Sequence, residues 1–231
     1  MKNRKWYYLT PDSLIMGMLL ALVGGYLDAY TYITRDGVFA TAQTGNTVLF
    51  AVRAVSPDYD GALQNVPPFL AFVAGAFIAE HMKERLLDKH FRAVLLLECV
   101  ILFIVGWLPG SVPNMIITIS VAFVSSLQIG TFNKLGKWSY NSTITTGNLR
   151  TASSASYTAL VKHEREALKK FIAFTAIIFC FITGALIGTF FSSAFEYRAI
   201  WIASGIILIT AVLYHNSREQ EGTEEMIEVK E

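Results

Sequence analysis

The sequence predicts an all-α integral membrane protein. Its mean hydropathy is +0.45. Charged residues make up 16% of the 231 residues, whereas soluble domains contain about 25%. Several apolar runs approach the roughly 20 residues that a helix needs to cross a bilayer. Because the net charge is only +1, nothing in the charge balance points to nucleic acid, and the expected partner is the lipid bilayer.

Six apolar segments predict six transmembrane helices. The first is longer than the apolar region of a secretory signal, and no small-x-small cleavage site follows it, so we expect it to be retained. The shorter segments need flanking residues to complete a crossing. The segments are Leu14–Ile33, Leu63–Met82, Ala93–Leu108, Met115–Phe132, Phe171–Phe191 and Ala199–Tyr214.

Two further stretches, Val38–Val55 and Asn141–Val161, are neither long apolar runs nor ordinary polar loops. If neither stretch crosses the membrane and the N-terminus is cytoplasmic, 16 of the 19 lysines and arginines lie inside. Since positive residues concentrate on the cytoplasmic side, we expect six spans, two re-entrant segments and both termini in the cytoplasm. The acidic tail, residues 217–231, is expected to be disordered.

The two unusual stretches share a motif. Thr44-Gly45-Asn46 recurs 102 residues later as Thr146-Gly147-Asn148. The surrounding order of segments also recurs, which indicates two halves, about 12–90 and 112–190, each followed by a further helix or tail, in a single membrane domain. Three spans in each half reverse the direction of the second, so we expect an inverted 3+3 repeat, an arrangement common in transporters.

Each re-entrant stretch is expected to enter extended, turn at Thr-Gly-Asn and leave as a half-helix. Thr44 or Asn46, and Thr146 or Asn148, are expected to cap these helices. The two helix N-termini would face the membrane middle, where their free N–H groups favour an anion or a group with acceptor oxygens. The predicted substrate site is Thr44, Gly45, Asn46, Thr47, Thr145, Thr146, Gly147 and Asn148. The alternative is that both motifs are capping turns in ordinary loops.

Polar residues inside the spans extend the candidate site. A charge at the membrane centre is costly, so Asp28 is expected either to bind a coupling ion or to pair with Arg35 or a tyrosine. Gln128 is expected either to face the cavity or to bond a neighbouring helix. For Glu98, a position at the cytoplasmic interface is favoured.

An enzyme is not expected. The four histidines are scattered, and no G-x-S-x-G elbow or phosphate-binding glycine loop is present,. We therefore predict no catalytic residues, no metal site and no cofactor. Cys99 and Cys180 lie inside apolar runs and favour packing over a disulfide,.

The segment Gly24–Ala29, followed by Thr44–Thr47 and the second Thr-Gly-Asn, resembles the YoaK-like family of bacterial membrane proteins. The resemblance covers roughly residues 12–214. This family has no established function, so the resemblance implies a multi-pass protein of the bacterial plasma membrane rather than an activity.

The sequence therefore predicts a secondary transporter or channel for a small polar solute, an anion being favoured, bound near the midplane between the two half-helices. The alternative is a non-transporting membrane partner or assembly subunit. The small size is compatible with a homodimer. A polar cavity at the two Thr-Gly-Asn motifs would favour the transporter.

Overall fold

The computed structural model describes residues 9–56, 58–86 and 89–228, with side chains up to residue 220. Almost all of this chain is helical. The helices are α1 (Leu14–Thr34), α2 (Gln43–Val55), α3 (Tyr59–Leu63), α4 (Val66–Leu86), α5 (Lys89–Trp107), α6 (Asn114–Thr131), α7 (Thr145–Val161), α8 (Arg165–Phe195), the 3-10 turn η2 (Glu196–Ala199) and α9 (Ile200–Glu228).

The fold is that of a multi-pass helical membrane protein. Five stretches of the described chain are long and apolar enough to cross a bilayer, and the last, Arg165–Gln220, contains both α8 and α9. The all-α prediction overlooked a small hairpin, in which β1 (Lys134–Leu135) pairs with β2 (Trp138–Ser139). Gly136, with a φ of +57°, forms its turn, and a two-residue ladder is too short to leave a strand signal in the sequence.

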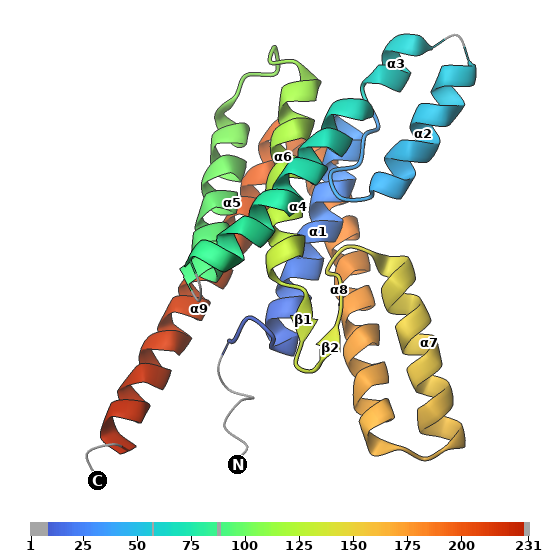
Figure 1. Cartoon of the computed structure of the whole chain (residues 1–231). Coiled ribbons are helices and arrows are strands. Elements are labelled where there is room, and N and C mark those ends of the chain that lie inside the picture. The colour runs from blue at the N-terminus through green and yellow to red at the C-terminus, as the bar shows by residue number, and fades with distance from the viewer. Residues whose placement is uncertain (1–8, 57, 87–88, 229–231) are drawn as a thin grey trace.

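Two helix pairs form the centre of the molecule: α1 packs along α8, and α4 packs along α6 (Figure 1). In each pair, a glycine lets the two helix backbones approach closely. A Cβ on Gly184 of α8 would overlap the backbone carbonyl of Leu22, and a Cβ on Gly75 of α4 would overlap that of Phe123. Small residues at such crossings let helix backbones approach in a membrane, where lipid is as apolar as the side chains.

The remaining long helices complete the body. Helix α5 packs against α9 and α6, and the main core of buried apolar side chains runs through α1, α5, α6 and α9. Two tyrosines of α1 join this helix to the turn before α9: Tyr26 Oη donates to the Ala199 carbonyl at 2.6 Å, and Tyr30 Oη donates to the Tyr197 carbonyl at 2.9 Å. Both rings are fully buried.

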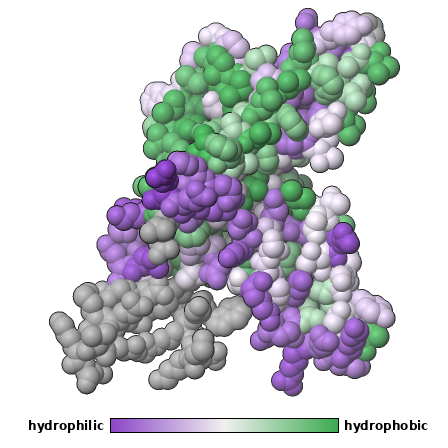
Figure 2. Space-filling model, in the orientation of Figure 1, coloured by the Kyte–Doolittle hydropathy of each residue, from purple (hydrophilic) through white to green (hydrophobic). Residues whose placement is uncertain are grey.

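The surface separates by polarity. Figure 2 shows a broad apolar area over the upper parts of α4, α5 and α6, with hydrophilic atoms gathered where α4 ends and α5 begins. Large apolar side chains such as Phe77, Phe103 and Phe190 are at least half exposed. An exposed apolar belt of this extent is typical of helices that face lipid rather than water.

Helix α9 continues to Glu228, into the acidic segment 217–231 for which disorder is predicted, and residues 229–231 lie outside the described residues. The acidic composition predicted disorder, but glutamate, glutamine, arginine and methionine are also good helix formers. A helix that has already begun adds such residues at little cost, since propagation is easier than nucleation.

Candidate functional site

A cavity of about 550 Å³ lies where α2 and α7 begin. The two helices start beside this cavity and run toward opposite ends of the molecule (Figure 1). Its wall combines hydroxyl, amide and carboxylate side chains with aromatic rings. The polar lining residues are Asp28, Tyr32, Thr41, Gln43, Thr44, Thr143, Thr145, Thr146 and Thr189, and the aromatic ones also include Phe39, Phe72 and Phe181.

The starts of α2 and α7 have the same local geometry. The residues before the helices, Ala42 (φ −82°, ψ 70°) and Ile144 (φ −85°, ψ 82°), adopt nearly the same backbone conformation. At each helix start, the N–H of the first helical residue donates to the carbonyl two residues earlier and closes a three-residue turn. Gln43 donates to Thr41 and Thr145 donates to Thr143, both at 3.0 Å. These positions are 102 residues apart, as the motifs are.

The predicted position of the turn was wrong. The chain turns at Ala42 and Ile144, and Thr-Gly-Asn forms the first helical turn that follows. Gly45 and Gly147 are not among the glycines of positive φ. Because the turn has an inverse γ conformation, which any residue can adopt, glycine is not needed there.

The predicted caps were also wrong, because neither helix has a side-chain cap hydrogen bond at its start. A threonine or asparagine inside the first turn cannot cap its own helix. The leading N–H groups of a helix have no partner within it. Those of Thr44 and Thr146 are therefore available at the cavity end.

The two asparagines fasten the preceding loops. Asn46 accepts from the Phe39 N–H at 2.9 Å and donates to the Phe39 carbonyl at 2.8 Å. Asn148 donates to the Asn141 carbonyl at 2.6 Å. Both asparagines are buried and neither lines the cavity. Each bonds the residue seven positions earlier, so this pair holds an extended segment against its helix.

Asp28 of α1 faces the start of α2. Its carboxylate accepts from the Thr41 N–H and from the Thr41 hydroxyl, both at 2.7 Å. The side chain is buried and is the only carboxylate among the described residues that line the cavity. Arg35, one of its predicted partners, instead donates to Asn114 and to the Tyr30 hydroxyl.

The other predicted site residues lie outside the cavity wall. Gly45 packs against the Phe39 ring, which a Cβ would approach to 3.0 Å, and Thr47 donates to the Gln43 carbonyl at 2.9 Å. Gly147 is exposed. The structure therefore brings together Asp28, Thr44, Thr145 and Thr146 from the predicted set, and it keeps Gly45, Asn46, Thr47, Gly147, Asn148 and Gln128 away from the wall.

Gln128 and Glu98 form a buried polar pair between α6 and α5. With the amide nitrogen directed at Glu98, Gln128 donates to both carboxylate oxygens, at 3.0 and 2.9 Å. The other amide atom lies 3.3 Å from the Ser142 hydroxyl. Glu98 is completely buried within the protein, and its position relative to the membrane interface stays a prediction. Helix α9 packs against α5. The sequence of α5 by itself does not reveal this contact.

Sequence reasoning missed Thr41 and Thr143, which both line the cavity. Each lies directly before one of the two turns, and Thr41 also donates its N–H to Asp28. They too are 102 residues apart, so extending the repeat three residues upstream would have found them. Within the described ranges, no three His, Cys, Asp or Glu side chains gather in a way that could hold a metal ion. The two cysteines are free.

Comparison with known families finds one match. A family model described as "Protein of unknown function (DUF1275)" matches residues 16–213. No curated protein and no solved structure matches the chain. Since the family model covers α1 through most of α9, including both helix starts at the cavity, the chain belongs to the DUF1275 family.

Proposed function

We propose that this protein is a secondary transporter or channel for a small polar solute that carries an anionic group. The observation that carries the proposal is the cavity shared by the starts of α2 and α7, with Asp28 beside them. Helix N-termini present free N–H donors and a positive dipole end. An assembly subunit has no need of such a cavity, whereas discontinuous helices meeting at a polar site are typical of transporters.

We further propose that the two halves are an inverted repeat. The contact of α1 with α8 and that of α4 with α6 are equivalent if α1, α2 and α4 correspond to α6, α7 and α8. The glycines at the two crossings, Gly184 and Gly75, then occupy matching positions. The opposite directions of α2 and α7 also support a two-fold relation in the membrane plane.

The cavity is electrically asymmetric, and this gives the solute an orientation. At the start of α2, the Asp28 carboxylate is already held by Thr41. The first turn of α7 contains no acidic residue, and the nearby Asn141 is neutral. The anionic group would therefore bind at Thr145 and Thr146. Asp28 would face the opposite, less anionic end of the solute or a coupling cation.

A cytoplasmic location of both termini is part of the proposal. The start of α1 and the end of α9 lie at the same end of the molecule (Figure 1). Lys83, Lys134 and Arg218, which the charge distribution assigns to the cytoplasm, line one cavity at that end. This clustering agrees with the bias of basic residues toward the inside.

The experiment is a thermal-shift screen of the purified protein against small organic anions and zwitterions, followed by uptake of the best solute into proteoliposomes. Thr44→Val and Thr146→Val remove one hydroxyl each from the cavity while keeping the backbone. We expect each variant to weaken solute binding at least about tenfold, because a hydrogen bond to a charged group is worth about 1.5 kcal/mol or more.

Matched controls come from the same two helices. Thr47→Val and Thr151→Val remove hydroxyls that bond the helix backbone one turn earlier and do not line the cavity. These variants should bind the solute as the wild type does. Asn46→Ala and Asn148→Ala should lower the melting temperature without solute. The proposal fails if no solute is bound or transported, or if cavity and control variants behave alike.

A further inference from the structure

A second cavity, of about 530 Å³, lies at the other end of α1. Five separate parts of the chain form it: the segment before α1, the end of α4, the start of α5, the end of α6 with β1, and the middle of α9. The lining residues are Pro11, Asp12, Lys83, His90, Phe91, Thr131, Phe132, Asn133, Lys134, Tyr214 and Arg218. It shares no residue with the cavity at α2 and α7.

The charge of this cavity is positive. Lys83, Lys134 and Arg218 contribute three cations, and Asp12 is the only carboxylate among the described lining residues. Asp12 already accepts a hydrogen bond from the Thr10 hydroxyl at 2.8 Å. Lys83 is paired with Glu80 at 2.7 Å, but Glu80 is itself largely exposed, with 67% of its side chain accessible. An exposed pair of this kind contributes little and is readily exchanged.

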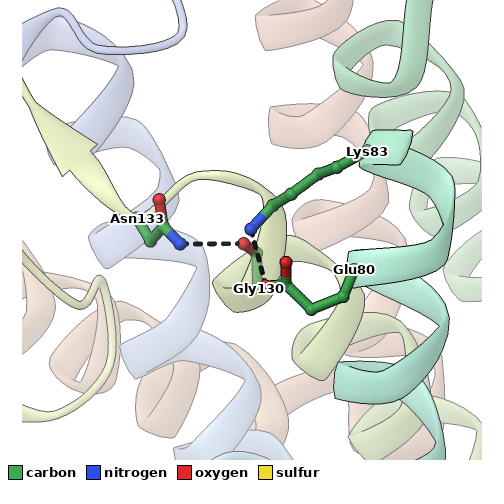
Figure 3. Close-up of polar contacts among 4 residues, drawn as sticks. All are labelled: Glu80, Lys83, Gly130 and Asn133. Carbon is green, nitrogen blue, oxygen red and sulfur yellow. Dashed lines mark hydrogen bonds and ion pairs between the residues drawn. The ribbon is translucent and has the colours of Figure 1, made fainter. Parts of the chain in front are cut away.

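Figure 3 shows how two of these donors lie. Lys83 from α4 and Asn133 from the segment after α6 point toward one another beside the Gly130 carbonyl, to which Asn133 donates at 3.2 Å. Together they form one edge of the cavity. Lys134 follows Asn133 in the sequence and also lines the cavity, so lysines from two different elements contribute to its wall.

A buried hydroxyl belongs to a residue of the wall and has no partner among the described residues. Thr131 is 3% exposed, and within the described part of the chain its Oγ1 forms no hydrogen bond, although the residue lines the cavity. Buried polar atoms are nearly always satisfied, and an orphan calls for an explanation such as a missing ligand. A hydroxyl beside several cations is suited to an oxygen-rich anion, since it can donate to an anionic oxygen.

We propose that this cavity binds a phosphate group. Cations from three elements converge on it, as in phosphate sites where arginine and lysine supply charge-assisted donors. The aromatic residues Phe91, Phe132 and Tyr214 supply an apolar wall for whatever carries the phosphate. The phosphate belongs either to an anionic phospholipid of the adjacent leaflet, since basic pockets between membrane helices bind lipid headgroups, or to a soluble molecule.

The test measures binding to the purified full-length protein by thermal shift and native mass spectrometry. The probes are inorganic phosphate, short-chain phosphatidylglycerol and, as a zwitterionic comparison, short-chain phosphatidylcholine. The variants are the double variant Lys134→Gln/Arg218→Gln and the single variant Thr131→Val. The control is Lys162→Gln/Lys169→Gln, which removes two exposed positive charges near the turn between α7 and α8, far from the cavity lining.

We expect phosphatidylglycerol or phosphate to bind the wild type and the control equally. The double variant should bind at least about tenfold more weakly, because it loses two charge-assisted contacts. Thr131→Val should also weaken binding, yet its melting temperature without ligand should not fall, since replacing an unsatisfied buried hydroxyl by a methyl group is nearly neutral. This combination separates a ligand contact from a structural role.

The probes identify the source. Binding of phosphatidylglycerol without binding of inorganic phosphate assigns the site to a lipid headgroup, and binding of phosphate alone assigns it to a soluble ligand. The proposal is overturned if neither probe binds or if phosphatidylcholine binds as well as phosphatidylglycerol. It is equally overturned if the control loses as much affinity as the double variant, because the interaction would then be a general effect of surface charge.

Discussion

Asp28 illustrates how a single buried carboxylate organises the loop before α2. Its two oxygens receive the backbone N–H and the hydroxyl of Thr41 at 2.7 Å. The turn before α2 is thereby tied to α1. A buried carboxylate is stabilised when it accepts such hydrogen bonds, and breaking them leaves costly unsatisfied groups. Asp28 therefore has a structural role that is present whether or not solute is bound.

Asp28→Leu should lower the melting temperature by several degrees. It leaves the buried Thr41 N–H without an acceptor, which costs about 1–3 kcal/mol. Asp28→Asn should cost less, because its carbonyl oxygen can still accept from that N–H. Thermal unfolding in detergent measures both. Asp60→Asn, at an exposed position, is the control and should leave stability unchanged. Equal stability of Asp28→Leu and the wild type would contradict the structural role.

The two asparagines of the Thr-Gly-Asn motifs have contacts that their residue type does not predict. A Thr-Gly-Asn motif beside a cavity predicts an asparagine that contacts solute. Asn46 and Asn148 instead bond the backbone of Phe39 and Asn141, seven residues earlier in each case. The asparagine of the motif thus holds the preceding segment against the start of its helix. Neighbouring threonines line the cavity.

At the scale of elements, α2 and α7 differ from the long helices in what holds them. Helix α2 packs lightly, mainly against α3 and α4, whereas α7 packs along α8. The pairs α1 with α8 and α4 with α6 instead cross through glycine contacts. Close approach of α1 and α8 fixes their relative height, and therefore the positions of Asp28 and Thr189 in the cavity wall.

Gly25→Ala and Gly184→Ala should each sharply reduce the yield of folded protein. The added Cβ of Gly25 would overlap the Phe181 carbonyl, and that of Gly184 the Leu22 carbonyl. Neither backbone can move without separating α1 from α8. Gly205→Ala in α9 is the matched control, since a Cβ there meets nothing within 4 Å and alanine is favoured in a helix by about 1 kcal/mol.

Size-exclusion chromatography of the detergent-solubilised variants measures the effect. Monodisperse Gly205→Ala together with aggregated or absent Gly25→Ala is the expected pattern. Normal yield and melting temperature for both crossing variants would show that α1 and α8 are not in such close contact.

For the whole molecule, the proposed inverted repeat makes a topological prediction. Ser56 follows α2 and Lys162 follows α7, and both are exposed. If the halves are inverted, a membrane-impermeant maleimide should label Ser56→Cys in intact cells and Lys162→Cys only after permeabilisation. The background is Cys99→Ala/Cys180→Ala, which removes the native thiols. Asn216→Cys, at an exposed position in the middle of α9, should behave as Lys162→Cys does. Labelling of Ser56 and Lys162 from the same side would exclude the inverted arrangement.

Much of the architecture could be predicted because lipid imposes strict rules. Apolar length locates the long helices, because each apolar segment overlaps one of them. The segments extend past their helices by one residue at Leu108, Phe132 and Ala199 and by three residues at Leu63. The recurring Thr-Gly-Asn located the first turns of α2 and α7. The turn residues, the absence of caps and the burial of Glu98 could not be predicted, because each depends on what a neighbouring helix covers.

The sequence by itself determined that this is a helical membrane protein with two related unusual segments, since hydropathy and a 102-residue repeat are properties of the chain alone. Only the tertiary structure decided that α2 and α7 begin at one cavity, that Asp28 holds the turn before α2, and that basic residues from α4, β1 and α9 line a second cavity. The physical reason is distance along the chain: periodicity reports what one helix prefers, whereas a binding site is formed by side chains that only helix packing brings together.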